Sequence, residues 1–222
     1  MVKLLIEAIF KFSLGALLTG TLLFVSAGTI AYFNGWLFMA ALFIPMFIAG
    51  IVMAFKNPSL LKSRLNAKEM QNEQGLVVKL SGVMFLIGFI VAGLGKRFGW
   101  YSFSLKIVYF GLAIFLIAYL LYAEVLRENS YLSRTIKVQE NQKVIDTGLY
   151  GIVRHPMYSA TLVLFLSMPI VLGSIYSFLV FLIYPFILVR RILLEEAFLK
   201  KELPGYVEYM QKVRYRLIPF VW

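Results

Sequence analysis

Two polar clusters flank one long apolar segment near the C-terminus. Arg154 and His155 precede an uncharged run from Met157 to Val189, and the basic and acidic residues of Arg190–Glu196 follow it. Only 15% of the residues are charged, and ionisable groups at membrane depth are costly and mark functional sites. If the apolar segment folds back on itself, the two clusters meet, and we expect a polar ligand to bind between them.

The first cluster lies where a helix is predicted to begin. Pro156 suits the first helical position because it lacks the backbone donor that this position leaves unpaired. Free amides at a helix start, with the positive end of the helix dipole, favour an anion such as a carboxylate or phosphate. Two simpler interpretations stay open: Arg154 and His155 anchor the helix at the interface, and Arg191 and Glu195 form an ordinary ion pair on one helix face.

The composition indicates an integral membrane protein built from helices. Hydrophobic residues make up 61% of the 222 residues, and the mean hydropathy is +0.83, whereas soluble domains are roughly 45–50% apolar. A helix needs about 20 apolar residues to cross the bilayer core. The chain therefore has room for five or six spans with short loops, and we predict an all-α membrane protein without a separate soluble domain.

The residue counts disfavour several function classes. The chain has no cysteine and one histidine, which argues against disulfides, thiolate nucleophiles and metal sites built from these residues. The net charge is +11, but the basic residues flank apolar blocks, where they set orientation and meet anionic lipid headgroups. We expect membrane lipids around the chain, no metal and no nucleic-acid partner.

Five uncharged runs are the candidate membrane segments. They are Phe12–Phe33, Trp36–Phe55, Leu80–Gly95, Ile107–Ala123 and Met157–Val189. The first run exceeds the roughly 7–15-residue core of a cleaved signal peptide, so we expect a retained helix. The last run has 33 residues and would extend about 50 Å as one helix. Gly173-Ser174 at its middle is a natural break.

The distribution of lysine and arginine favours a hairpin over a single last span, because cytoplasmic loops are enriched in these residues. With six spans and the N-terminus inside, 19 basic residues are cytoplasmic, together with the polar loops 56–74 and 127–147, and only Lys96, Arg97 and Lys106 are outside. With a single last span, only 12 basic residues would be cytoplasmic and 10 would be outside. We predict about six transmembrane helices, the last two a short hairpin with halves of about 24 Å, and both termini cytoplasmic.

This hairpin brings Arg191 and Glu195 back to the same side of the membrane as Arg154 and His155. One site can therefore contain all four residues. Beyond Glu196 the apolar pattern predicts two amphipathic helical pieces separated by Pro204-Gly205. We expect these cytoplasmic pieces to lie along the membrane surface and to cap the site.

Four motifs follow one another in the C-terminal third. They are G-x-Y-x-x-V-R-H-P-x-Y at 148–158, R-x-x-x-E-E-x-x-L at 191–199, G-Y-x-x-Y at 205–209 and R-Y-R-L-I-P at 214–219. In order, spacing and topology they resemble the isoprenylcysteine carboxyl methyltransferase family. The same module is similar in phospholipid N-methyltransferases and, more distantly, in membrane sterol reductases. We therefore divide one structural unit into N-terminal helices and loops (1–142) and a methyltransferase-like module (143–222).

The resemblance implies S-adenosylmethionine as methyl donor at the cytoplasmic end of the hairpin. On physical grounds we predict a catalytic role for Arg154 and Arg191, because either guanidinium could fix an acceptor carboxylate. The residues that the resemblance implies for cofactor binding are Tyr150, Val153, His155, Pro156, Tyr158, Glu195 and Glu196. The spacing leaves open which of the two glutamates contacts the cofactor. A carboxylate acceptor is already charged, so alignment and desolvation suffice, whereas an amine must first lose a proton.

The leading prediction is a membrane-embedded, S-adenosylmethionine-dependent methyltransferase that acts on the carboxylate of a lipophilic, prenylcysteine-like acceptor. This small molecule or lipidated substrate would enter from the bilayer near Met157. The alternatives are a phospholipid amine N-methyltransferase, an NADPH-dependent sterol-type reductase, and a non-catalytic transporter or scaffold. We expect a prokaryotic inner membrane, or the endoplasmic reticulum in a eukaryote.

Overall fold

The computed structural model of the protein describes residues 2–65, 72–133, 135 and 138–222. The described part is helical and contains no strand. Its elements are α1 (Val2–Ala27), α2 (Phe33–Lys56), α3 (Pro58–Leu65), α4 (Asn72–Arg97), α5 (Leu105–Glu128), the 3-10 turn η1 (Gly148–Gly151), α6 (Pro156–Val171), α7 (Ile175–Phe181), α8 (Tyr184–Glu202) and α9 (Tyr206–Lys212). The prediction of an all-α membrane protein is confirmed.

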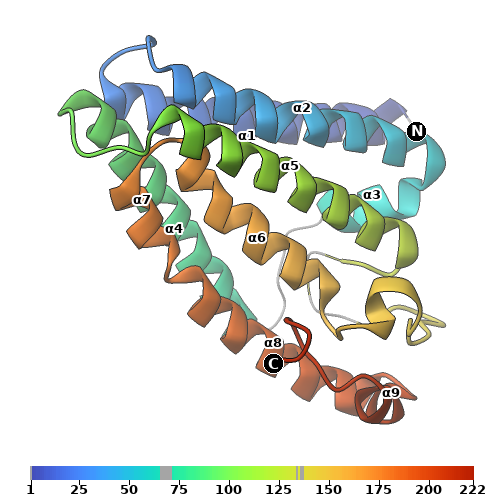
Figure 1. Cartoon of the computed structure of the whole chain (residues 1–222). Coiled ribbons are helices and arrows are strands. Elements are labelled where there is room, and N and C mark those ends of the chain that lie inside the picture. The colour runs from blue at the N-terminus through green and yellow to red at the C-terminus, as the bar shows by residue number, and fades with distance from the viewer. Residues whose placement is uncertain (1, 66–71, 134, 136–137) are drawn as a thin grey trace.

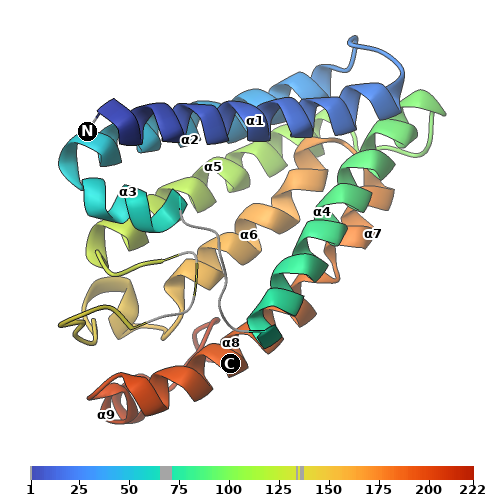
Figure 2. The same ribbon diagram turned by 180° about the vertical axis from the view of Figure 1, so that it is seen from behind.

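The long helices form a bundle with two different ends. Helix α6 packs against α5 and against α7 and α8, and α4 packs against α1, α7 and α8. At one end, α4 and α6 begin, α5 and α8 end, and α3 and α9 lie beside them (Figures 1 and 2). We call this the site end, because it holds both polar clusters of the sequence.

In the part of the chain that the structure describes, five helical segments are long and apolar enough to cross a membrane: α1, α2, the Gln74–Arg97 part of α4, α5 and the combined Ile175–Glu202. The apolar helix α6 is shorter, with 16 residues and a length of about 24 Å. The first half of the hairpin thus has the predicted length. The second half is longer than predicted, because α8 continues past the apolar run to Glu202.

The hairpin turn lies where the sequence predicts the break. Gly173 has a φ of +74°, a backbone conformation that favours glycine, and the Ser174 side chain caps α7 by accepting from the Ser177 amide at 3.2 Å. The Tyr32 hydroxyl donates to the Leu172 carbonyl at 2.7 Å. This turn returns the chain along α4, so the end of α8 comes back to the start of α6.

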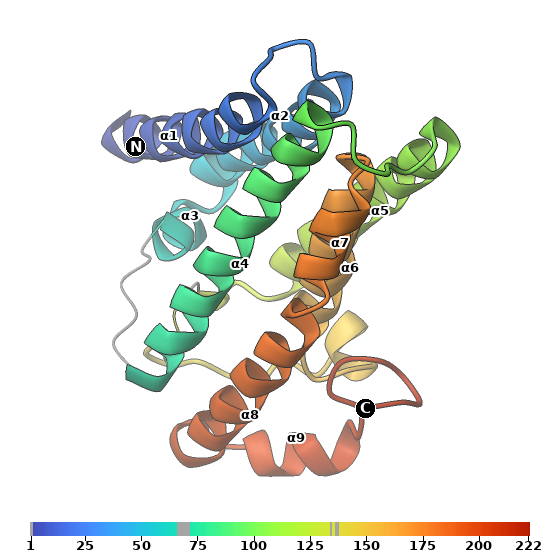
Figure 3. The same cartoon turned by 90° about the vertical axis from the view of Figure 1, so that its left-hand side faces the viewer.

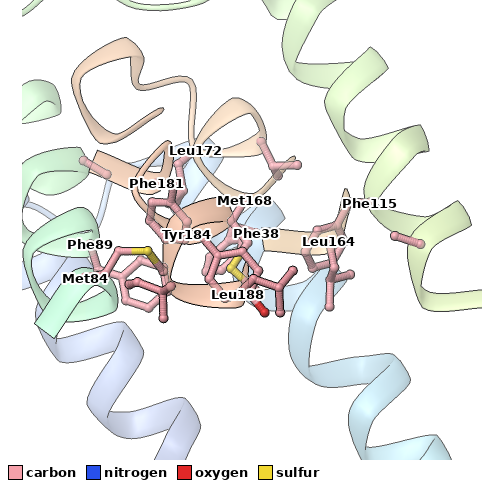
Figure 4. Packing of buried hydrophobic residues seen from close by; sticks show 14 of the residues in the cluster. Phe38, Met84, Phe89, Phe115, Leu164, Met168, Leu172, Phe181, Tyr184 and Leu188 are labelled. Atoms are coloured by element: carbon pink, nitrogen blue, oxygen red, sulfur yellow. The ribbon is translucent and has the colours of Figure 1, made fainter. Parts of the chain in front are cut away.

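Aromatic side chains fill the centre of the bundle (Figure 4). Phe38, Phe115 and Phe181 are fully buried, and neighbouring rings meet mostly edge-on or tilted, as Phe85 and Phe181 do at 5.5 Å between centroids. Other apolar side chains point outward, for example Leu120, which is 71% exposed. A large exposed apolar surface on the long helices suits contact with lipid.

Two details differ from the sequence prediction. The segment 56–74 is not a simple polar loop, because α3 forms there and buries Leu61 and Leu65 against α1 and α2; residues 66–71 lie outside the described part. The two C-terminal helical pieces are separated at Pro204-Gly205, as predicted, because α8 ends at Glu202 and α9 begins at Tyr206. However, α9 turns a cluster of apolar residues inward, and Figure 3 shows it crossing the end of α8.

The crossing of α1 and α4 depends on Gly93. A Cβ atom there would lie 2.5 Å from the Leu23 carbonyl oxygen and 2.6 Å from Ser26 Cβ. We predict that Gly93→Ala destabilises the purified protein by about 1–3 kcal/mol, because a backbone atom cannot yield. The matched control is Gly82→Ala on the same helix, where nothing lies within 4 Å. Thermal unfolding in detergent should give a lower midpoint for the first variant only; equal midpoints would contradict this packing.

Candidate functional site

A cleft opens at the site end between the start of α6, the end of α8, α9 and the loop before η1. It contains about 810 Å³ of empty space, which includes space open to solvent. The residues that line it are Asn129, Tyr131, Leu132, Ser133, Thr135, Gln142, Lys143, Val144, Ile145, Tyr150, Arg154, His155, Met157, Tyr158, Arg191, Glu195, Leu199, Leu203, Tyr206 and Tyr209. Polar and aromatic groups therefore face one cavity.

A buried ion-pair network forms one side of the site. Glu196 is 2% exposed, and its Oε1 accepts from Arg154 Nε at 2.7 Å and lies 3.3 Å from His155 Nε2. Its Oε2 accepts from Arg216 Nε at 2.9 Å. Arg154 Nη1 donates to the carbonyls of Val213 and Arg214, both at 2.8 Å. The carboxylate thus joins the start of α6 to the C-terminal segment.

The backbone at the start of α6 is held by the same segment. Pro156 is the first residue of the helix and His155 is its N-cap, as predicted. The Arg154 amide donates to the Tyr215 carbonyl and the His155 amide to the Arg216 carbonyl, each at 2.9 Å. The C-terminal segment therefore uses both of these amides as hydrogen-bond donors, so they are not available to an anion. The anion site at the helix start stays a prediction.

The turn before α6 is also fixed by a carboxylate. Gly148 has a φ of +55°, and a Cβ atom there would overlap the Glu128 carboxylate. That carboxylate accepts from the Leu149 amide at 3.0 Å. The end of α5 and η1 are thereby joined, which positions Tyr150 in the cleft.

A second set of polar contacts faces the cleft from α6 and α8. The Tyr158 hydroxyl donates to the Glu195 carboxylate, and Arg191 Nε donates to the same hydroxyl oxygen at 2.9 Å. Arg191 also donates from Nη1 to Gln74 at 3.4 Å, and the His155 ring stacks beside that of Tyr158 with centroids 5.7 Å apart. An anionic, a cationic and an aromatic group therefore lie together where the cleft approaches the apolar helices.

Tyrosines cover the opposite side. The Tyr209 hydroxyl donates to the Tyr150 carbonyl at 2.8 Å, which ties α9 to η1. The Tyr206 ring lies 5.8 Å from that of Tyr209. Burial raises the pKa of Tyr150, Tyr206 and Tyr209 well above the usual range of a phenol, so all three hydroxyls keep their protons at neutral pH.

The predicted site residues fall into two groups. Six of them line the cleft: Tyr150, Arg154, His155, Tyr158, Arg191 and Glu195. The other three, Val153, Pro156 and Glu196, are buried but are not among the lining residues. The two adjacent glutamates are thus separated by the helix, because Glu196 continues the buried face of Ile187, Leu188 and Ile192, whereas Glu195 reaches the cavity.

Sequence reasoning missed the loop 129–145, which supplies nearly half of the lining. It has no motif, and its placement depends on contacts with distant helices. Tyr206 and Tyr209 were also not assigned, although the G-Y-x-x-Y motif at 205–209 contains them. Their spacing of three puts both on one face of α9, and this signal predicts that they lie side by side.

A comparison with protein families gives a match over part of the chain. A family model described as phospholipid methyltransferase matches residues 107–204, which run from α5 through α8 and include all nine predicted site residues. The segment of α9 and the C-terminus lies beyond this match. No curated protein matches the chain.

The two glutamates should respond differently to the same change. We predict that Glu196→Gln lowers the free energy of unfolding by about 3–5 kcal/mol, because it leaves the buried Arg154 without its counter-charge. Glu195→Gln should change stability little, because its amide oxygen can still accept from Tyr158. Thermal unfolding of both variants checks this. A stable Glu196→Gln protein would show that the network does not hold the site together.

Proposed function

We infer that this chain methylates the carboxylate of a lipophilic acceptor with S-adenosylmethionine. Its match over residues 107–204 places it in the superfamily of isoprenylcysteine carboxyl and phospholipid methyltransferases. That it is a membrane methyltransferase follows from the family match and the apolar helices. The donor and the acceptor are our proposal. The observation that carries it is the Glu195–Tyr158–Arg191 set at the border between the cleft and the apolar helices.

The cleft residues fit the chemistry of S-adenosylmethionine. This molecule carries a sulfonium, an ammonium, a carboxylate, a ribose and an adenine. Aromatic faces such as those of Tyr158 and His155 attract a sulfonium by cation–π interaction, and the Glu195 carboxylate accepts hydrogen bonds from an ammonium or from ribose hydroxyls. When bound, S-adenosylmethionine supplies an electrophilic methyl group.

Arg191 is our candidate for holding the acceptor. Its guanidinium lies 6.0 Å from the centre of the Tyr158 ring, and the two contacts to Tyr158 and Gln74 fix its direction. A guanidinium binds a carboxylate through parallel hydrogen bonds and stays charged, so it orients the acceptor without protonating it. Arg154 has a different task, because its Nε and Nη1 are engaged by Glu196 and the C-terminal segment.

A carboxylate acceptor needs no general base. Its oxygen is already a charged nucleophile, and methyl transfer displaces the thioether in line. The protein contributes by holding the two reactants close and by excluding water. His155 stands beside Glu196, at 3.3 Å, inside a buried network, which suits a positioning residue better than a group that must collect a proton from an amine.

A phospholipid amine is the second candidate acceptor, and the description of the matching family favours it. Its phosphate would suit Arg191 as well as a carboxylate does. Its ammonium must lose a proton before the nitrogen can attack. The two candidates therefore differ in the pH dependence of the rate, which falls at low pH for an amine in the range where the amine is protonated.

We further propose that the site end faces the cytoplasm and that the acceptor arrives through the bilayer. The orientation rests on the excess of basic residues at this end. Met157, the first apolar residue after Pro156, lines the cleft, and the exposed apolar side chains of α8 such as Phe186 (76% exposed) continue toward the hydrocarbon. A lipid tail can therefore remain in an apolar environment while its polar end reaches Arg191.

Transfer of a labelled methyl group tests the proposal. The purified chain is supplied with S-adenosylmethionine carrying tritium in its methyl group, and with either a farnesylcysteine analogue or a phosphatidylethanolamine vesicle. We expect a base-labile methyl ester with the first acceptor. Label in the lipid headgroup would replace the carboxylate proposal by the amine alternative, and no transfer to either would contradict both.

Arg191→Lys tests the assignment of the acceptor. We predict that it raises the KM for the carboxylate acceptor about tenfold, because an ammonium loses the paired hydrogen bonds of a guanidinium. The dissociation constant for S-adenosylmethionine should change little. Arg190→Lys, at the exposed neighbouring position, is the matched control and should leave both constants unchanged. An unaltered KM in Arg191→Lys would show that a group other than Arg191 binds the acceptor carboxylate.

A further inference from the structure

One hydroxyl in the wall of the cleft has no hydrogen-bond partner. Tyr206 lines the cleft and is 4% exposed, and its Oη is buried and unpaired. A buried polar group without a partner costs about 1–3 kcal/mol, so a protein keeps one only where something compensates for it. The neighbouring Tyr209 shows the contrast, because its hydroxyl is satisfied by the Tyr150 carbonyl at 2.8 Å.

The surroundings define what this hydroxyl can bind. Burial and the nearby charges of Glu196 and Glu195 raise the pKa of Tyr206 well above its usual range, so its oxygen keeps the proton and acts as a donor. Tyr206 directly follows Gly205, whose φ of +83° turns the chain into α9. Tyr206 and Glu195 line the same cleft, and the partner that the Tyr206 hydroxyl lacks is a hydrogen-bond acceptor.

We propose that the Tyr206 hydroxyl donates a hydrogen bond to a ribose oxygen of S-adenosylmethionine, while the Glu195 carboxylate accepts from a hydroxyl of the same ribose. This proposal rests on the proposed function, which supplies the ligand. A vicinal diol satisfies both sides at once, because each hydroxyl both donates and accepts.

The charges favour the ribose over the other acceptor groups of the ligand. The methionyl carboxylate is anionic, and at Tyr206 it would stand close to Glu195 and Glu196, where like charges repel. A neutral hydroxyl suits a position between a phenol donor and a carboxylate acceptor.

Binding and stability of two tyrosine variants test the assignment. S-adenosylhomocysteine, its 2′-deoxy analogue and its 3′-deoxy analogue are titrated calorimetrically into the detergent-purified chain, into Tyr206→Phe and into Tyr209→Phe. We expect Tyr206→Phe to weaken binding of the parent compound about tenfold and to bind one deoxy analogue almost as well as the parent. The wild-type protein should bind that same analogue about tenfold more weakly than the parent.

Thermal unfolding without ligand separates this role from a structural one. Tyr206→Phe removes an unpaired hydroxyl, so its midpoint should equal or exceed that of the wild type. Tyr209→Phe leaves the Tyr150 carbonyl without its donor, so its midpoint should fall. Unchanged affinity in Tyr206→Phe, with the wild type binding normally, would overturn the role of Tyr206 and leave the proposed function intact. Failure of the wild type to bind S-adenosylhomocysteine or S-adenosylmethionine would overturn both.

Discussion

The Glu196 carboxylate joins three segments that are far apart in the sequence. It lies on α8, Arg154 stands before α6, and Arg216 belongs to the C-terminal segment. A buried carboxylate loses its hydration, so it must be compensated by charge and hydrogen bonds. Because the two arginines come from different segments, this compensation is complete only when all three segments meet. The wall of the cleft is therefore tied to the same contacts that fasten the end of the chain.

The bundle makes this meeting possible. The break at Gly173 returns the apolar chain to the side from which it started, and Gly93 lets α1 and α4 approach closely. Tyr32 holds the far end of the hairpin through the Leu172 carbonyl. The two ends of the bundle thus have different roles. Apolar packing sets the direction of α6 and α8, and ion pairs at the site end set the distance between the start of α6 and the end of α8.

The helical fold, the hairpin and the meeting of its two polar ends could be predicted from the sequence, because the apolar runs and the break at Gly173-Ser174 both point to them. The orientation in the membrane and the roles of the site residues stay predictions. What could not be predicted are partners at long range. Local rules predict free amides at the start of α6, but they do not reveal that the C-terminal segment binds the amides of Arg154 and His155. The separate tasks of Glu195 and Glu196 follow from the buried stripe that contains Ile192, a pattern present in the sequence. Helix α3 was missed because its leucines are interspersed with polar residues and gain burial only against α1 and α2.

The proposed site for S-adenosylmethionine is tested most directly by an experimental structure of the detergent-purified chain with saturating S-adenosylhomocysteine. We predict density for the ligand in the cleft, with its ribose between Glu195 and Tyr206 and its sulfur toward Tyr158. Density in a second cavity, which Asn34 and Trp100 line near the hairpin turn, would contradict this location. An empty cleft in a protein shown to bind the ligand would do the same.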